Sequence, residues 1–418
     1  MSELRVFDRI NRQMMRLGFL KHVVKRVVAT STTSLDNLGN NLIDTLSRKV
    51  QVPLSESRVK YIRIRLYDRV YSTLKKQAND WDSVSSEPKY VLMEIQDLYL
   101  SDPDIPSGVG KLVKADWDKY QPLGINLGFI RSGTYSANTR ALSLLYFTPE
   151  EDQAAFKEYT SKINPLLINR YQSLLFLYAY LENDGEVIAP FWSRLLESGM
   201  KQFNDRDAGD LLPEIYLSII ERHRKKFHSA EIRDRLNVLE KSAESIAKHR
   251  GKARYSGGSA REISSRVRLE PFVDIGIFTK KEPLRYDFMF SPVGVTWAEN
   301  LSRLQTTEEL EKFLANNFFG TAAKAWGLSA TKMSDINTIV QRLKIAWKSI
   351  TSPGGYAPIE EMALVAGINT LVEENSIIEQ NNAREAIIAY QKENPYEVRF
   401  TVDRLGKLAH ARFLDEAR

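Results

Sequence analysis

Residues 259–301 read SAREISSRVRLEPFVDIGIFTKKEPLRYDFMFSPVGVTWAENL and carry the strongest fold signal in the chain. Ser259 is a good N-cap for a helix from Ala260 to Glu270. Two runs rich in aromatic and β-branched residues follow at 271–278 and 286–290, and a polar, Pro-containing segment separates them. The stretch therefore predicts a helix followed by a short antiparallel hairpin.

Two more helices are predicted just before this stretch. Apolar residues recur at roughly helical spacing from Leu211 to Ile220, and Asp210 is a candidate N-cap for that helix. A second amphipathic run follows Ser229 and extends to Ile246, with apolar residues at three- and four-residue steps. The predicted order is therefore three helices and a hairpin.

The segment from Lys248 to Arg268 is strongly basic, with Glu262 as its single acid. A run of this charge cannot pack into a core, so we expect it to face water or phosphate. On the predicted helix 260–270 the arginines should occupy exposed positions, while Ile263 and Val267 point inward. The cations of the segment are Lys248, Arg250, Lys252, Arg254, Arg261, Arg266 and Arg268.

The helix, the sequence DIGIF at 274–278 and the sequence YDFMFSPVGVTWAENL at 286–301 together resemble the end of a winged-helix domain, of the helix-turn-helix superfamily. The resemblance covers residues 206–305, about a quarter of the chain. It implies that the basic third helix enters the major groove of DNA. The hairpin tip would meet phosphates through Lys280, Lys281 and Arg285. Many winged-helix domains bind proteins instead of DNA, so a protein partner stays open.

Weaker copies of this pattern lie elsewhere in the chain. Residues 1–150 are predicted as an N-terminal helical region that ends, at 123–147, in a possible second winged-helix-like unit with Arg131 and Arg140 as its cations. Residues 151–205 and 306–350 are predicted helical connectors, the second with two helices. In the first connector, the sequence Asn-Asp-Gly at 183–185 predicts the end of a helix.

The sequence TSPGG at 351–355 is the best linker candidate in the chain. Beyond it, residues 355–418 are predicted as a third winged-helix-like unit. Its helices are expected at 359–373 and 377–392, and its strands at 397–402 and 407–413. The alternative is a small α+β interaction domain. The basic residues expected on this hairpin are Arg399, Arg404, Lys407, His410 and Arg412.

Composition indicates a globular protein of 418 residues, with 43% hydrophobic and 27% charged residues. The net charge of +6 is modest, but the basic excess is locally concentrated, which favours a polyanionic partner. The absence of cysteine excludes disulfides, cysteine-zinc sites and thiol nucleophiles. No apolar run is long enough to span a bilayer, so we expect a cytoplasmic protein without membrane contact.

Catalytic and metal-binding signatures are weak. No phosphate-binding loop of the Walker type and no Gly-x-Ser-x-Gly motif occurs, and the five histidines show no ligand spacing. We therefore predict no cofactor and no metal site. A Mg²⁺-dependent nuclease remains an alternative function, because it would need clustered acids with a nearby lysine. The suggestive residues are Glu94, Asp97, Asp102, Asp104 and Lys111.

We predict a mainly α, multidomain protein with short antiparallel β-hairpins and one to three winged-helix-like units. The predicted function is non-enzymatic binding of double-stranded DNA. A chain with several such modules resembles a DNA-engaging subunit of a larger bacterial assembly for restriction, defence or recombination, with protein partners. The second alternative function is a scaffold that holds partner proteins, which would show apolar instead of basic surface on the third helix.

Overall fold

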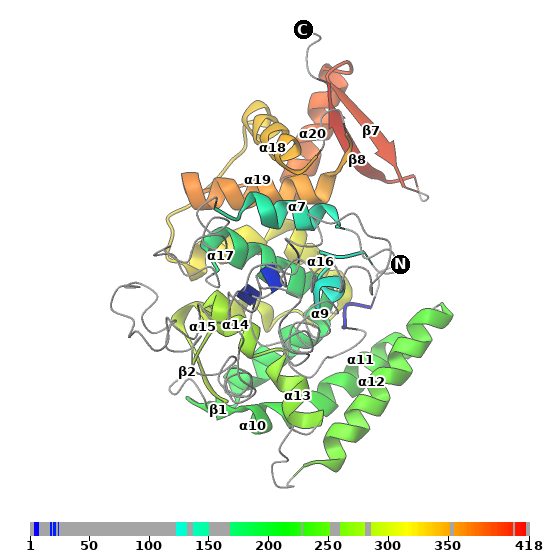
Figure 1. The fold of residues 1–418 in the computed structure, drawn as a ribbon, viewed down its shortest axis with the longest axis vertical. Helices are drawn as coiled ribbons and strands as arrows, with labels where there is room; N and C mark the ends of the chain where they lie inside the picture. The colour runs from blue at the N-terminus through cyan, green and yellow to red at the C-terminus, as the bar shows by residue number, and fades with distance from the viewer. Residues whose placement is uncertain are drawn as a thin grey trace, which may run out of the picture.

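The computed structural model describes residues 4–7, 17, 18, 20, 21, 24, 123–131, 137–149, 168–226, 229–250, 260–280, 286–351, 355–403 and 406–414. In this part the protein is mainly α-helical with small β-sheets (Figure 1), as predicted. The candidate nuclease residues between Glu94 and Lys111 lie outside it. None of the helices that it contains is long and apolar enough to cross a membrane.

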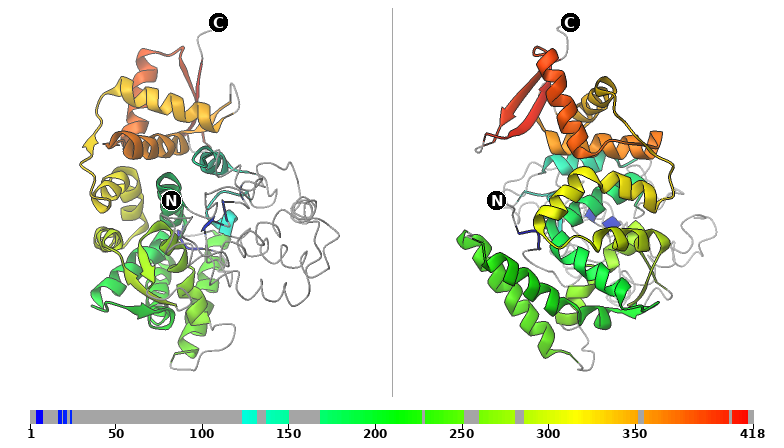
Figure 2. Two further views of the ribbon diagram at one scale, coloured as in Figure 1. Left: turned by 60° about the vertical axis from the view of Figure 1, so that its left-hand side comes forward. Right: turned by 180° about the vertical axis from the view of Figure 1, so that it is seen from behind.

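Helix α9 (Arg170–Glu197) runs through the middle of the molecule (Figures 1 and 2). Asn169 and Gln172 cap its start reciprocally, each side chain accepting from the other's backbone N–H. The helix is apolar on nearly all sides and is almost entirely buried, which is typical of a helix surrounded by protein. The elements that pack against it are α11 (Leu212–Arg224), α14 (Glu270–Ile275), α15 (Pro292–Leu301), α16 (Thr307–Asn316) and α19 (Ile359–Glu374).

The predicted helix end at 183–185 coincides with an interruption of α9, where two helical segments meet. Helix α9 continues through this sequence with a kink, where Asp184 has the non-helical angles φ −133° and ψ 15°. Helix α16 approaches closely at this point, since a Cβ on Gly185 would lie 2.5 Å from Leu310 Cδ2. The signal at 183–185 therefore marks a kink between two helical segments, and the chain continues as a helix beyond it.

The central region confirms the first two predicted helices, as α11 (Leu212–Arg224) and α12 (Ala230–Lys248). The Ser229 side chain caps α12, as its position suggested. Asp210 does not cap α11, because that position belongs to Leu211. Two short segments precede α11, namely β1 (Phe203–Asn204) and α10 (Asp205–Gly209).

The predicted third helix, 260–270, is shorter than expected and ends at Arg266 as α13 (Ala260–Arg266), and a separate helix, α14 (Glu270–Ile275), follows. The first predicted β-run is therefore mostly helical, because Pro271 suits the first turn of a helix and Gly276 ends it in the left-handed region at φ 86°. The hairpin itself is confirmed. Strands β2 (Phe278–Lys280) and β3 (Asp287–Phe290) are antiparallel, and β1 completes a sheet of order β1-β3-β2.

Helix α15 (Pro292–Leu301) follows the hairpin, with Ser291 as its N-cap. The predicted two-helix connector contains three helices, α16 (Thr307–Asn316), α17 (Phe318–Ala325) and α18 (Ile336–Ile350). The short strand β4 (Thr331–Lys332) precedes α18.

The C-terminal region confirms the predicted helices and hairpin. Helix α19 (Ile359–Glu374) is followed by α20 (Gln380–Glu393) and by the antiparallel strands β7 (Val398–Val402) and β8 (Leu408–Phe413). Two short strands were not predicted. Strand β5 (Ala357–Pro358) adds to the hairpin in the order β5-β8-β7, and β6 (Ser376–Ile377) pairs in parallel with β4.

Helix α19 joins this region to the rest of the protein. It packs against α9, α7 (Thr139–Tyr146) and α17, as well as against α18 and α20. Its buried side chains, including Met362 and Leu364, belong to the same hydrophobic core as those of α9. The sequence TSPGG therefore lies between elements that share one core.

Candidate functional site

The predicted recognition arginines are not on an exposed surface. Arg268 is fully buried, and its guanidinium binds Asp184 through Nε and Nη2 at 2.7 and 2.9 Å. Its Nη1 also donates to the Tyr216 hydroxyl and to the Ser264 carbonyl. The expectation that Arg268 faces solvent is wrong, because the kink in α9 supplies a buried carboxylate that pairs with it.

The same correction applies to the two arginines of α13 and to one hairpin lysine. Arg261 donates to both carboxylate oxygens of Asp210, at 3.0 and 3.2 Å. Arg266 binds Asp205 at 2.6 Å and stacks over Tyr286. Each of these side chains is largely buried, as is Lys280, which lies 2.7 Å from Glu270 instead of projecting from the hairpin tip.

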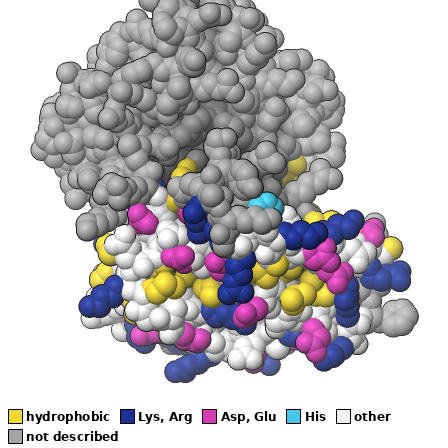
Figure 3. Space-filling view, turned by 90° about the horizontal axis from the view of Figure 1, so that it is seen from below, with side chains coloured by type: hydrophobic (Ala, Val, Ile, Leu, Met, Phe, Trp, Pro, Cys, Tyr) yellow, Lys and Arg dark blue, Asp and Glu magenta, His cyan; other side chains and the backbone are white. Residues whose placement is uncertain are grey.

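Lys248 and Arg250 are exposed, as predicted, at the C-terminal end of α12. The neighbouring surface is mixed in charge. Figure 3 views the end of the molecule where α10 and α13 lie, and there Lys and Arg side chains are interspersed with Asp and Glu. The predicted cations outside the described residues are Lys252, Arg254, Lys281, Arg285 and Arg404.

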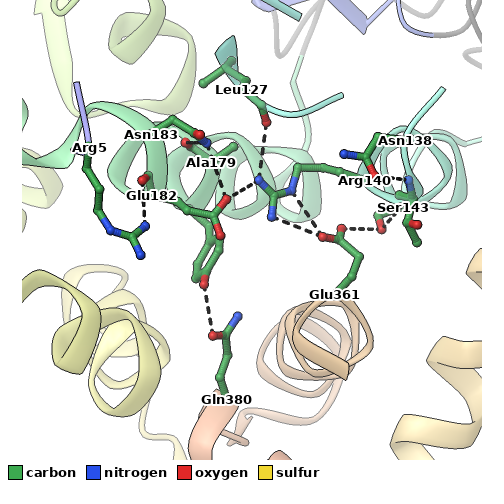
Figure 4. Close-up of polar contacts among 12 residues, drawn as sticks. Arg5, Leu127, Asn138, Arg140, Ser143, Ala179, Glu182, Asn183, Glu361 and Gln380 are labelled. Carbon is green, nitrogen blue, oxygen red and sulfur yellow. Dashed lines mark hydrogen bonds and ion pairs between the residues drawn. The ribbon is translucent and has the colours of Figure 1, made fainter. Parts of the chain in front are cut away.

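A buried charge network crosses α9 (Figure 4). Arg140 of α7, predicted as a DNA-facing cation, lies between Glu182 of α9 and Glu361 of α19. Its Nη1 donates to Glu182, whereas Nε and Nη2 donate to Glu361 at 3.3 and 3.2 Å. Ser143 donates to the other oxygen of Glu361 at 2.7 Å. Three helices distant in sequence are thus joined by two carboxylates and one guanidinium.

The N-terminal segment 4–7 lies against the kink of α9. The backbone N–H of Arg5 donates to Glu186 at 2.9 Å, and that of Phe7 donates to Asp184 at 3.1 Å. Glu186 also lies 2.8 Å from Nε2 of the buried His223 on α11. The acids at 182, 184 and 186 therefore each meet a partner from another segment.

The surroundings shift the pKa values of these acids in different directions. Burial alone would raise the pKa of Glu182, but the positive charge of Arg140 and its hydrogen bond hold it below the ordinary value. Burial also opposes ionisation of Glu186, whereas the bonds from His223 and the Arg5 backbone lower its pKa overall. For Asp184 burial prevails over the bond to Arg268, and its pKa is raised.

The contacts of Arg140 and of the acids at the kink have the properties of a structural charge network, because their charged groups are paired and buried between packed elements. Among the residues that the structure describes, no group of three or more His, Asp or Glu side chains is placed to hold a metal ion. The network therefore supplies cohesion between α7, α9, α11 and α19.

The outer face of the C-terminal sheet is different. Strand alternation places Val398, Ala411 and Phe413 on the inner face, where all three are buried. Arg399 and Arg412 are directly opposite each other on the outer face. Arg399 is exposed and Arg412 is half-buried, and the exposed Lys407 follows the turn between the strands. Predicted cations Arg399 and Lys407 are therefore accessible.

Neither Arg399 nor Arg412 forms an ion pair or side-chain hydrogen bond with a residue in the described part of the chain. The nearest acids along the hairpin are engaged elsewhere. Glu397 accepts from the Tyr390 hydroxyl at 2.6 Å, which raises the pKa of Tyr390 to about 12 and keeps it a donor. Asp403 accepts from the backbone N–H of Lys407. Two like charges directly opposite across strands repel each other.

Tyr356 belongs to this face but was not singled out from the sequence. It immediately precedes β5, where Ala357 pairs with Ala411 and Pro358 with His410. Extending this antiparallel register by one residue puts Tyr356 opposite Arg412. Ala357 is buried on the inner face, whereas Tyr356 is 42% exposed. The only available signal was its position after the Gly pair, because a two-residue strand has no periodicity.

Comparison with protein-family models, with curated proteins and with solved structures found no match to this chain.

Proposed function

We propose that the protein binds double-stranded DNA through the outer face of its C-terminal sheet, as a subunit of a larger bacterial assembly. The observation that carries this proposal is the facing pair Arg399 and Arg412, which has no acidic partner among the described residues. Phosphate groups would relieve the repulsion between the two guanidinium groups and accept their hydrogen bonds. Lys407 at the turn extends the same positive surface.

The order of elements supports this proposal. From α18 onward the chain contains a helix, the strand β5, the helices α19 and α20 with the two-residue strand β6 between them, and a hairpin to which β5 adds. This is the order that we associate with a winged-helix unit, which commonly contacts nucleic acid with its helix and hairpin. The proposed interface is therefore in the third predicted unit and not on α13.

The test is a salt titration of binding to a random-sequence duplex. Wild-type affinity should fall steeply as salt rises, because bound phosphates release counterions. The double variant Arg399→Ala/Arg412→Ala should bind more weakly and reduce the log–log salt slope by about two, or about one per lost contact. Arg303→Ala, which removes an exposed arginine on the segment between α15 and α16, is the matched control and should behave as wild type.

Equal affinity and salt slope for wild type and the double variant would refute this interface. A complete lack of duplex binding at low salt would refute DNA binding altogether. The scaffold alternative would then take precedence, and it has its own support. Helices α11 and α12 form an antiparallel pair that leaves Leu217 and Val238 each 52% exposed. Exposed apolar side chains on adjacent helices suit a protein partner.

A further inference from the structure

The outer face of the C-terminal sheet has an aromatic side chain at the end of its row of cations. Arg412 of β8 pairs with Arg399 of β7, and extending the register of β5 and β8 by one residue puts Tyr356, the residue before β5, opposite Arg412. Because neighbouring strands lie about 4.8 Å apart, the three side chains span roughly 10 Å. A ring and two guanidinium groups are therefore within reach of adjacent nucleotides.

An exposed tyrosine beside arginines has a specific chemistry toward nucleic acid. The base pairs inside a blunt duplex are stacked on each other and do not present their faces to a protein. A base without a pairing partner can stack on an aromatic ring, while its phosphate and the next one meet the arginines. Arg412 and Arg399 would then follow the backbone that leads away from the stacked base.

We infer that this face binds the junction between double-stranded and single-stranded DNA, with Tyr356 stacking the first unpaired base and Arg412 and Arg399 binding the adjoining phosphates. The inference depends on the proposed DNA binding and specifies the DNA structure that this face prefers. It gives a role to Tyr356, which the duplex proposal does not use.

The experiment compares two fluorescent DNA probes that share one duplex, one blunt and one with a short single-stranded tail. Wild type should bind the tailed probe at least about fivefold more tightly, since stacking of one base corresponds to roughly 1–3 kcal/mol. Tyr356→Ala should lose this preference and retain its affinity for the blunt duplex. Tyr356→Phe keeps the ring and should retain the preference. Tyr396→Ala removes a tyrosine that is 88% exposed outside the row, and it should behave as wild type.

A second readout follows stacking directly. The fluorescence of 2-aminopurine placed as the first unpaired base should be quenched by wild type and by Tyr356→Phe, but not by Tyr356→Ala. The inference would be overturned, while DNA binding stands, if wild type bound both probes with equal affinity. It would also be overturned if Tyr356→Ala lost the same amount of affinity for both probes. If Arg399→Ala/Arg412→Ala binds the blunt duplex as wild type does, the proposed function fails instead.

Discussion

Two groups of cations in this protein look alike in sequence and differ in the folded chain. The arginines of α13 and the segment after it are paired with acids and largely buried. The arginines of the C-terminal hairpin face each other without a described acidic partner. The difference arises because α9 brings Asp184, and α10 with the residue that follows it brings Asp205 and Asp210, to the first group. A basic run in a sequence thus indicates a nucleic-acid surface only when no acid from another element reaches it.

The two groups should also contribute differently to stability. Burying a charge costs several kcal/mol, and a buried pair offsets that cost only when its geometry is good. The bidentate contact of Arg268 with Asp184 meets this condition. In the hairpin, Arg399 is exposed and Arg412 is half-buried, and neither has an acidic partner in the described part of the chain. Their removal should therefore affect binding and leave the fold intact.

The largest expected effect comes from separating the two regions. A chain that ends at residue 353 lacks α19, whose buried side chains pack against α9 and α7. It also lacks Glu361, the partner of Arg140. We expect this truncated chain to be insoluble or to lose cooperative unfolding, as measured by circular dichroism in a denaturant series. A soluble, cooperatively unfolding product would instead support the domain boundary that the sequence TSPGG suggests.

Next in size is the loss of the buried pair in the central region. Arg268→Met leaves Asp184 buried without its cation, which should lower the free energy of unfolding by about 3–5 kcal/mol. The double variant Arg268→Met/Asp184→Asn removes both charges and should recover part of this loss. Denaturant midpoints of both variants provide the measurement. An Arg268→Met midpoint equal to that of wild type would mean that the pair contributes nothing to folding.

A smaller effect concerns pH. The folded state lowers the pKa of Glu186, so the stability that this carboxylate provides is fully present above its ordinary value of 4.5 and is lost as the pH falls through the lowered value. Glu186→Gln should have a lower free energy of unfolding than wild type at pH 7. The difference between the two free energies should narrow below pH 4.5 by at most about 1.4 kcal/mol per pH unit. A difference in free energy of unfolding that stays constant from neutral to acidic pH would contradict the lowered pKa of Glu186.

The smallest expected effect is that of the hairpin turn. Lys407→Ala removes one exposed cation and should reduce the salt slope of duplex binding by about one, with the unfolding midpoint unchanged. Arg261→Ala provides the contrast from the central region. It breaks the pair with Asp210 and should lower the midpoint while leaving the salt slope as in wild type. If Arg261→Ala instead reduced the salt slope and Lys407→Ala lowered the midpoint, DNA binding would be assigned to the central region and the stabilising role to the hairpin.

The sequence by itself determined the local structure of most elements in which apolar residues recur at a regular spacing. The helical spacing at 211–220 and 229–246 predicted α11 and α12, and the two β-prone runs at 397–402 and 407–413 predicted the hairpin of β7 and β8. These elements follow from the alternation of apolar and polar side chains over short distances. The sequence also predicted that Arg399 and Lys407 would be exposed.

Tertiary structure alone decided which charges are paired. Arg268 and Asp184 are far apart in the sequence and meet at the kink of α9. Strand β5 is too short to have a period of its own and forms only where β8 offers an edge, and that pairing brings Tyr356 beside Arg412. Local patterns cannot predict such contacts, since they depend on the packing of elements that are distant along the chain.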